Sequence, residues 1–582
     1  MSLTSSIAQA LCAALDYGPE RAGELERLLT TPPNLALGDF AFPCFQLAKQ
    51  LKTAPPKIAA EIAAKIPSGG LIGKAVAQGP YVNFYLARPA AAAEVLAALR
   101  ADPARYGGSE AGRGRTMVVE FSSPNIAKPF HFGHLRSTNI GANLARLFAF
   151  TGWNVVRRNY LGDWGTQFGF VIYAWRKWGD PAALAERAID YLVELYVRAY
   201  KESEQDPAVR DQARDLFRRL EQGDPEITPL WQQFRELSLA GFMRTYARLD
   251  IRFDNFDGEA AASRDMEAVI ERFVKAGVAV ESLGALVVPV ADVMGRDIAP
   301  LMLRKSDGAS TYAARDCAEA IARYERYRFD GNIYVVSRQE DYFAQLFVAL
   351  SKLGKAEGWP VDWPAVSENV SFGFVRGMST RKGEAVWLED VLDEARDRAQ
   401  RVREEKSAAN PRAFPALPPT ELAAISESVG QAALLYFDVS SRRLSDVTFD
   451  WDTVLQFDGN TGPYLQYAHA RMCGIFRKAA EQGLAAGETV ATALADEEWA
   501  LVLCLREFPL AVERACNERE PHEISRFLGT LASSFNAFYN NHTVLDANDR
   551  ATSAARLALV KASQVVLANG LKLLGIRPLE LM

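Results

Sequence analysis

The stretch TMVVEFSSPNIAKPFHFGH, residues 116–134, contains the pattern that decides the fold. Its first six residues are mostly β-branched, apolar or aromatic, which is typical of a buried strand. A polar turn follows, and a helix is expected from about His134 to Thr151. A second strand, Asn154 to Tyr160, leads into a turn with two glycines and another helix. This order of strand, loop and helix predicts a doubly wound parallel sheet.

Two of the five histidines in the chain, His131 and His134, lie where the first strand leads into its helix. Ligands bind at this edge of such sheets, and a helix N-terminus presents unpaired N–H groups to phosphate. Gly133 allows a nucleotide to approach the backbone, the imidazoles can donate hydrogen bonds to phosphate oxygens, and Lys128 adds a cation. No third ligand with suitable spacing accompanies the histidines, so we expect no metal ion held by the protein alone.

The size and composition of the chain predict several domains. At 582 residues, with 49% hydrophobic and 24% charged residues, the chain can bury more than one core. The formal net charge of −6 argues against a protein that coats nucleic acid by bulk charge. It leaves open a nucleic acid that is recognised through local basic patches and shape.

The sequence indicates a cytoplasmic protein. No apolar run of about 18 residues lacks charge, and the N-terminus has no basic segment ahead of an apolar run, so we expect neither a membrane span nor a signal peptide. The six cysteines are scattered without a CxxC pair, which argues against a zinc ribbon and against a disulfide framework. We expect most of them to be small buried residues.

Changes of pattern along the chain predict four parts: a small α/β module at 1–110, an α/β domain at 111–385 with a mainly helical insertion at about 180–295, a helical connection at 386–450, and a helical domain at 451–582. In the module, residues 79–86 are expected to form a strand. The insertion includes a hairpin near its end. The parallel alternation is expected to resume at Leu301 to Lys305, followed by a helix around Ala314 to Tyr327 and a strand at Asn332 to Val336.

Four blocks of the sequence resemble arginyl-tRNA synthetases, a family of class I aminoacyl-tRNA synthetases. They are EFSSPNIAKPFHFGHLRST at 120–138, NYLGDWGTQFG at 159–169, GMSTRKG at 377–383 and DGNTGPYLQYAHAR at 458–471. The likeness extends over nearly the whole chain, and His131 to His134 takes the place of the HIGH box. The resemblance implies a Rossmann-type class I catalytic domain with an insertion, an N-terminal domain that touches the D-loop at the elbow of transfer RNA, and an all-helical anticodon-binding domain.

The resemblance also implies a function. Such an enzyme activates L-arginine with ATP to form arginyl-adenylate and pyrophosphate, with Mg²⁺ accompanying the ATP. It then transfers the arginyl group to the 3′-terminal adenosine of tRNA(Arg), and the family often needs bound transfer RNA for the first step. The family is usually monomeric, and no membrane partner is expected.

A guanidinium is planar, forked and always charged, so a selective pocket should present carboxylates and other acceptors. Tyr312 and Asp316 are four residues apart, so the start of a helix would place them on one face. The resemblance implies that arginine is bound by one set of residues: Glu120, Ser123, Asn125, Tyr312, Asp316 and Gln339. Within this set, Asn125 and Gln339 match positions that hold the amino and carboxylate end of the substrate.

The second class I signature, KMSKS, is altered in this chain. Gly377 and Thr380 stand where the pattern has lysines. Family members of this kind carry a lysine just ahead of the HIGH box, and Lys128 occupies that position. The resemblance therefore implies three catalytic residues, Lys128, His131 and His134. It also implies an ATP site formed by Pro124, His131, Phe132, Gly133, His134, Met378, Ser379, Arg381 and Lys382.

Aromatic and basic side chains at close spacing predict contacts with transfer RNA. Aromatic rings stack on unpaired bases such as those of an anticodon loop. The candidates in the helical C-terminal part are Tyr464, Gln466, Tyr467 and Arg471. Near the N-terminus, Tyr81 and Asn83 match positions that read a D-loop base in some relatives.

Three other functions compete with this interpretation. One is a class I synthetase for another amino acid, which the predicted acidic pocket disfavours. The second is a non-catalytic RNA-binding paralogue, which should have lost the histidines, Lys128 or the pocket acids. The third is a small-molecule adenylyltransferase with the same histidine loop, which the length and the helical C-terminal part disfavour.

Overall fold

The computed structural model describes residues 3–128, 130–338, 341–377, 386–411, 414–457, 459–490 and 493–582. The chain divides into two compact units. One contains residues 107–470, 509–529 and 568–582, and the other contains residues 1–106, 471–508 and 530–567. No helix among the described residues is both long and apolar enough to cross a membrane.

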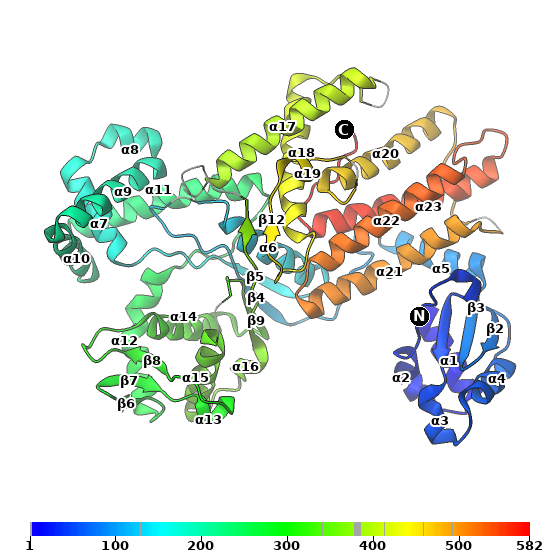
Figure 1. The fold of residues 1–582 in the computed structure, drawn as a ribbon, viewed down its shortest axis with the longest axis horizontal. Coiled ribbons are helices and arrows are strands. Elements are labelled where there is room, and N and C mark those ends of the chain that lie inside the picture. The colour runs from blue at the N-terminus through cyan, green and yellow to red at the C-terminus, as the bar shows by residue number, and fades with distance from the viewer. Residues whose placement is uncertain are drawn as a thin grey trace. The chain divides into compact units, whose positions relative to one another are not determined.

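A parallel sheet forms the centre of the larger unit, as the sequence predicts (Figure 1). Its strands lie in the order β10-β9-β4-β5, and every neighbouring pair is parallel. Glu120, the last residue of β4, is opposite Arg158 on one neighbour and Tyr334 on the other. The bounds of the strands are Thr116–Glu120 for β4, Asn154–Arg158 for β5, Gly331–Tyr334 for β9 and Ser367–Asn369 for β10.

Helices cover the sheet because its two central strands, β4 and β9, are buried on both faces. Helix α6, His134–Phe150, connects β4 to β5 and buries most of its residues. Helices α14, Tyr312–Tyr327, and α15, Tyr342–Glu357, contribute to one buried cluster that includes Val118 of β4. The positions of α6 and α14 agree closely with the helices predicted from the sequence.

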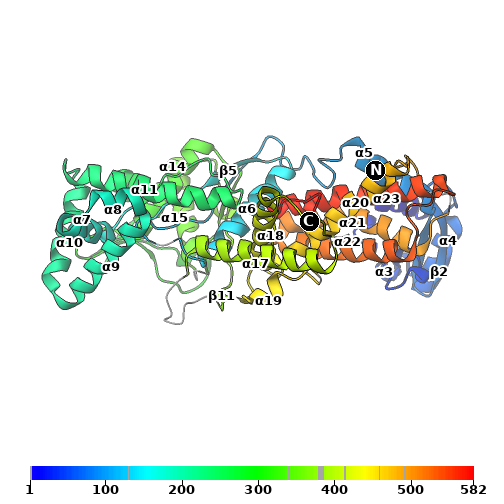
Figure 2. The ribbon, with the colours of Figure 1, turned by 90° about the horizontal axis from the view of Figure 1, so that it is seen from above.

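The helical insertion begins after β5. Asp180 and Asp206 each accept a hydrogen bond from a backbone N–H two residues later, and a proline follows each of them, so α8 and α10 have strong N-termini. The helices pack against one another (Figure 2). They are α7 (Thr166–Trp178), α8 (Pro181–Arg187), α9 (Ile189–Gln205), α10 (Pro207–Glu221) and α11 (Ile227–Arg248).

One strand prediction was wrong. Residues Leu301–Arg304 form β8, but β8 pairs antiparallel with β7, Ala285–Val288, and does not join the parallel sheet. With β6, Val280–Ser282, they make a separate three-stranded sheet that follows α12, Glu259–Lys275. An apolar run of four residues predicts a strand but does not specify its partner, so the parallel alternation resumes only at β9.

Helices α17 and α18 follow the sheet and pack closely on each other. Gly430 of α18 allows this approach, because a Cβ there would lie 2.7 Å from the carbonyl carbon of Ala395. The short strand β11 precedes the two helices in the chain and pairs in parallel with β12, which follows them. The bounds are Val375–Arg376 for β11, Leu388–Ala409 for α17, Pro419–Val439 for α18, Val447–Thr448 for β12, Trp451–Val454 for α19 and Gly462–Glu481 for α20.

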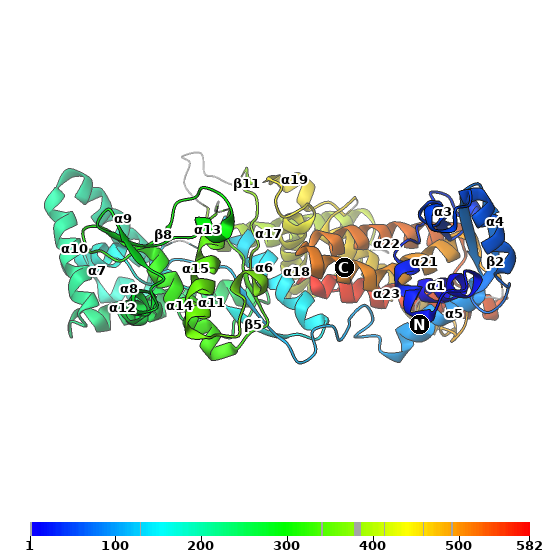
Figure 3. The same ribbon diagram turned by 90° about the horizontal axis from the view of Figure 1, so that it is seen from below.

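The smaller unit begins with an antiparallel sheet of order β1-β3-β2. Strand β3, Tyr81–Leu86, was predicted, but β2, Ile72–Gln78, was not, because glycine, lysine and alanine weaken its strand signal. Helix α4, Pro55–Lys65, packs on both strands (Figure 3). The other elements are α1 (Leu3–Ala14), β1 (Phe40–Pro43), α3 (Phe45–Leu51) and α5 (Arg88–Ala101).

Helical segments from the C-terminal part complete the smaller unit. The indole of Trp499 donates to Asp39 at 2.6 Å, and the other oxygen of Asp39 accepts from the N–H of Leu86 at 2.7 Å. The buried Asp39 therefore ties a C-terminal helix to the module. The three long helices here are α21 (Asp496–Glu518), α22 (His522–Asn541) and α23 (Arg550–Leu573), of which parts belong to the larger unit. All six cysteines are buried, as predicted for most of them, and none of the six forms a disulfide with another.

Candidate active site at the carboxyl edge of the parallel sheet

The loop between β4 and α6 has an unusual backbone that buried hydrogen bonds hold in place. Ser122, Ser123 and Ala127 have positive φ angles of 74°, 47° and 53°, which residues with a Cβ rarely adopt. The N–H of Ser122 donates to Ser137 Oγ at 3.0 Å, and the N–H of Ala127 donates to Ser238 Oγ at 3.1 Å. Such strain at the edge of a parallel sheet is typical of a functional loop.

The two histidines have different hydrogen-bonding capacities. His131 Nδ1 accepts the N–H of Gly133 at 3.1 Å, so the neutral ring carries its proton on Nε2 and can donate to a ligand. His134 Nδ1 lies 3.3 Å from the carbonyl oxygen of His131, which only accepts, so His134 Nε2 is an acceptor. Burial lowers the pKa of both rings, that of His134 to about 3. The prediction that both imidazoles donate to phosphate therefore fits His131 but not the neutral His134.

Gly133 is needed for the shape of this loop. A Cβ at position 133 would lie 2.9 Å from two atoms of the His131 ring. Gly133 itself has a helical φ of −60°, so the reason for glycine is space beside the imidazole and not an unusual backbone.

Lys128 is half-buried beside the same loop. Its ammonium lies 5.9 Å from the centre of the Tyr196 ring, and burial lowers its pKa while the charge of Glu259 opposes the change. Among the described residues, no carboxylate lies within ion-pair distance of it. The charge of Lys128 is thus available to a ligand at the N-terminus of α6.

Four predicted ATP contacts, Met378, Ser379, Arg381 and Lys382, lie outside the described residues. The backbone on the far side of this stretch is hydrogen-bonded to the histidine loop. The N–H of Phe132 donates to the carbonyl of Val386, and the N–H of Leu388 donates to that of Phe130, both at 2.9 Å. Val386 and Leu388, which follow the altered KMSKS segment in the sequence, therefore lie beside the HIGH-like segment.

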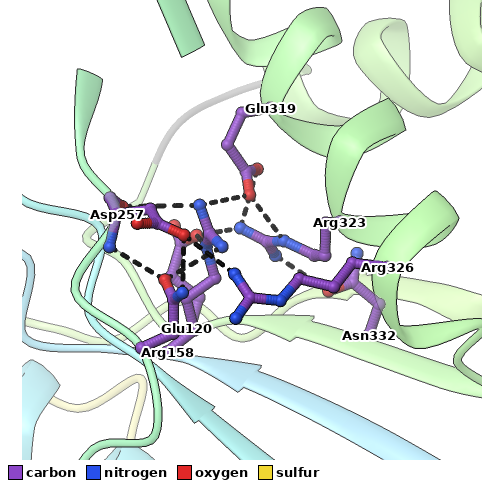
Figure 4. Close-up of polar contacts among 8 residues, drawn as sticks. Glu120, Arg158, Asp257, Glu319, Arg323, Arg326 and Asn332 are labelled. Carbon is purple, nitrogen blue, oxygen red and sulfur yellow. Dashed lines mark hydrogen bonds and ion pairs between the residues drawn. The ribbon is translucent and has the colours of Figure 1, made fainter. Parts of the chain in front are cut away.

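Glu120 lies in a buried cluster of acids and arginines (Figure 4). Arg323 Nη2 donates to Glu120 Oε2 and contacts Glu319 Oε2 at 2.7 Å. Arg158 contacts Glu319 Oε1 at 2.8 Å and Glu120 Oε2 at 3.8 Å. The remaining oxygen, Glu120 Oε1, has no partner in the described part of the chain. The closest guanidinium contacts of the predicted arginine-binding carboxylate are therefore to one oxygen, and the other oxygen accepts no hydrogen bond among the described residues.

Asp316 and its neighbours form the second part of the predicted arginine pocket. The phenol of Tyr342 donates to Asp316 Oδ2, and the Tyr342 ring lies 5.1 Å from that of Tyr312, which is 65% exposed. Burial and the charges of Glu120, Glu319 and Glu259 raise the pKa of Asp316 to about 7, although the Tyr342 hydrogen bond opposes the change. Gln339, which was also predicted to bind arginine, lies outside the described residues.

The loops after β4 and β5 run side by side. The N–H of Gly162 donates to the carbonyl of Pro124 at 3.0 Å, and Asn125 forms a parallel bridge with Gly162. A Cβ on Gly162 would lie 2.2 Å from Asn125 Oδ1, so the glycine leaves the space that the exposed Asn125 side chain occupies. Ser123 Oγ is buried without a partner among the described residues.

The predicted transfer RNA contacts differ in exposure. Tyr81 is 38% exposed and packs edge-on against Phe45, whereas Asn83 is buried and donates to Gln78 at 2.9 Å. Gln466 is fully buried and donates to the carbonyl of Arg577 at 2.8 Å. Asn83 and Gln466 therefore have structural roles, and their burial does not suit direct contact with a base. Tyr464, Tyr467 and Arg471 are half-buried.

Four residues that complete the pocket were missed from the sequence: Tyr342, Arg158, Glu319 and Arg323. Glu319 and Arg323 are four residues apart on α14, a spacing at which oppositely charged side chains meet on a helix. Arg158 is a charged residue at the end of the short strand β5. The spacing of Glu319 and Arg323 and the arginine in the strand are both visible in the sequence, but neither predicts that these side chains are buried.

The parallel sheet, the histidine pair at the start of α6 and the acidic pocket beside it define the catalytic domain of a class I aminoacyl-tRNA synthetase. Comparison with known proteins identifies the family. The model of the class I (R) transfer RNA synthetase catalytic domain matches residues 95–451, that of the arginyl-tRNA synthetase N-terminal domain matches residues 1–86, and that of the DALR anticodon-binding domain matches residues 465–582. The chain belongs to the arginyl-tRNA synthetase family, whose members are enzymes.

Individual relatives agree with this membership. The chain is 41% identical over 563 residues to the arginine–tRNA ligase of Clostridium perfringens and 41% identical over 565 residues to that of Clostridioides difficile, with 96% of each chain covered in both comparisons. Its structure is similar to that of Thermus thermophilus arginyl-tRNA synthetase, with a TM-score of 0.79, 26% identity and 99% of each chain covered. The Plasmodium falciparum enzyme shares the fold, with a TM-score of 0.78, 24% identity and coverage of 100% of this chain and 99% of that one.

Proposed function

We propose that this arginyl-tRNA synthetase activates L-arginine with ATP and esterifies the 3′-terminal adenosine of tRNA(Arg), using the residues described above. The observation that carries the assignment of roles is the acidic pocket of Glu120 and Asp316 at the same edge of the sheet as His131 and Lys128. The two carboxylates suit a guanidinium, and the histidine and the lysine suit phosphates.

In the first step, a carboxylate oxygen of arginine attacks the α-phosphorus of ATP. The bond from this phosphorus to the bridging oxygen breaks, and pyrophosphate leaves with the electron pair. His131 Nε2–H and Lys128 stabilise the negative charge on the phosphates, together with the segment that contains Met378 and Ser379. Mg²⁺ bound to ATP neutralises the β- and γ-phosphates. Catalysis needs no side-chain nucleophile, because positioning and electrostatic stabilisation are sufficient.

In the second step, the 2′-hydroxyl of the terminal adenosine attacks the carbonyl carbon of the adenylate. The bond from this carbon to the phosphate oxygen breaks, AMP leaves with the electron pair, and the hydroxyl proton is released. His134 Nε2, an acceptor in the neutral ring, suits a hydroxyl group of the nucleotide better than a phosphate oxygen. The candidates that remain for transfer RNA contact are the exposed Tyr81 and the half-buried Tyr464, Tyr467 and Arg471. We also propose that the enzyme is a cytoplasmic monomer.

Arginine binding should depend on pH through Asp316. The pKa of Asp316 is raised to about 7, so its carboxyl group is increasingly protonated below that pH and cannot pair with the guanidinium. We expect the KM for arginine to rise about tenfold when the pH falls from 8 to 6, while the KM for ATP changes little. Both constants can be measured by pyrophosphate exchange, and a KM for arginine that stays constant over this range would contradict the assignment.

ATP–pyrophosphate exchange with arginine, measured with and without tRNA(Arg), tests the proposed function. Exchange that depends on arginine and is promoted by transfer RNA is the expected result. Exchange driven by another amino acid would identify a different synthetase, and arginine-independent adenylyl transfer that ignores transfer RNA would favour the adenylyltransferase.

A further inference from the structure

Tyr160 lies at the pocket but has no role in the mechanism described above. It follows the end of β5 by two residues and precedes Gly162, which is bridged to Asn125. Arg158, the last residue of β5, is two residues before Tyr160 and lies opposite Glu120 in the sheet. Tyr160 therefore belongs to the same carboxyl edge as the residues proposed to hold arginine.

The hydroxyl group of Tyr160 is buried, and no hydrogen-bond partner for it exists among the described residues. Two buried tyrosines of this unit are hydrogen-bonded: the Tyr246 oxygen lies 2.7 Å from Ser122 Oγ, and Tyr436 donates to the carbonyl of Ser525 at 3.1 Å. The hydroxyl of Tyr334 shares with that of Tyr160 the lack of a partner among the described residues, but Tyr334 is part of β9 and not of the loop after β5. Buried hydroxyl groups are nearly always hydrogen-bonded, because leaving one unpaired costs free energy. A ligand could therefore supply the hydrogen-bond partner that the Tyr160 hydroxyl lacks.

The charges around Tyr160 indicate the kind of ligand. Burial raises the pKa of the Tyr160 hydroxyl well above its ordinary value, and nearby negative charges raise it further. These charges are those of Asp316, which acts most strongly, Glu319, Glu259 and Glu120. The phenol stays protonated and neutral, and the surrounding acids disfavour a phosphate or carboxylate ligand. A cationic group with several N–H donors fits this environment.

Two other acceptors in the pocket are also without partners among the residues that the structure describes. They are Glu120 Oε1 and the buried Ser123 Oγ. A guanidinium has five N–H donors in a fixed plane and no acceptor, so its donors point in several directions and need acceptors on more than one side of the group. Neutral oxygen acceptors satisfy the remaining donors without adding uncompensated negative charge to the pocket.

We propose that Tyr160 is a specificity-determining residue whose hydroxyl oxygen accepts a hydrogen bond from the guanidinium of the arginine substrate. The inference rests on the proposed function of this pocket. It adds a neutral acceptor, from the loop after β5, to the carboxylates of β4 and α14.

Replacement of Tyr160 by phenylalanine tests the proposal because it removes only the unpaired hydroxyl. The Y160F enzyme should show a KM for arginine that is raised about tenfold or more, since hydrogen bonds to charged groups contribute strongly. The KM for ATP should change little. The thermal midpoint of the free enzyme should be unchanged or slightly higher, because no internal hydrogen bond is lost.

Tyr436→Phe provides a matched control, because its hydroxyl has partners inside the protein. That variant should lower the thermal midpoint and leave the KM for arginine unchanged. The proposal is overturned if Y160F binds arginine as the unaltered enzyme does, or if it loses stability as Y436F does. ATP–pyrophosphate exchange by the unaltered enzyme separates the role of Tyr160 from the proposed function. If the unaltered enzyme shows no arginine-dependent exchange, the proposed function itself is rejected.

Discussion

Replacement of Lys128 with methionine should slow arginyl-adenylate formation by about 10²–10³-fold, because it removes a preorganised cation from the phosphates in the transition state. The pattern lysines of the second class I signature are absent at Gly377 and Thr380, so this loss has no obvious substitute. The affinity for arginine should remain nearly unchanged, because the guanidinium site is built from other residues. Pyrophosphate exchange measures the rate, and equilibrium binding of arginine measures the affinity.

Lys177→Met is a suitable control for the loss of a lysine from this part of the unit. The Lys177 ammonium is on α7 and forms an exposed ion pair with Glu202 at 2.6 Å, so its removal should leave exchange nearly unchanged. Lys128→Arg should recover part of the activity, because it restores the charge with a different shape. Equal losses of arginine affinity and exchange rate in Lys128→Met would assign Lys128 to folding or arginine binding instead.

The sequence was sufficient to predict the elements that carry the phosphate-binding part of the site. Val118 and Val119 are fully buried in β4, and the helix expected at His134 begins there. A β-branched run followed by a polar turn and two histidines is a local signal, and local signals determine where an element begins. Membership of the family then follows from the order of the four blocks.

The partners of individual side chains could not be predicted in the same way. Arg323 has the position of an ordinary charged residue on an amphipathic helix, yet it is 1% exposed and its guanidinium pairs with Glu120 at the end of β4. The tautomer of His131 depends on one backbone N–H, and the pairing of β8 depends on a strand that a short apolar run does not specify. These features arise from packing between distant segments.

Replacement of Arg323 with methionine should destabilise the catalytic domain more than any surface substitution. Glu120 and Glu319 would remain buried with only Arg158 to balance them, and an unpaired buried charge costs about 3–5 kcal/mol. The change in free energy of unfolding can be followed through the urea-induced transition of this domain. If Arg323→Met lowers the free energy of unfolding no more than a substitution of an exposed residue does, Arg323 does not balance the buried charges of Glu120 and Glu319.

Arg326→Met separates the loss of a buried pair from the loss of an arginine on the same helix. Arg326 is 57% exposed and pairs with Asp257 at 3.0 Å, so its replacement should cost less than about 1 kcal/mol. A second variant, Arg323→Met with Glu319→Gln, removes one charge of each sign from the cluster. Recovery of most of the lost stability in this double variant would show that charge balance, and not the volume of Arg323, determines the effect.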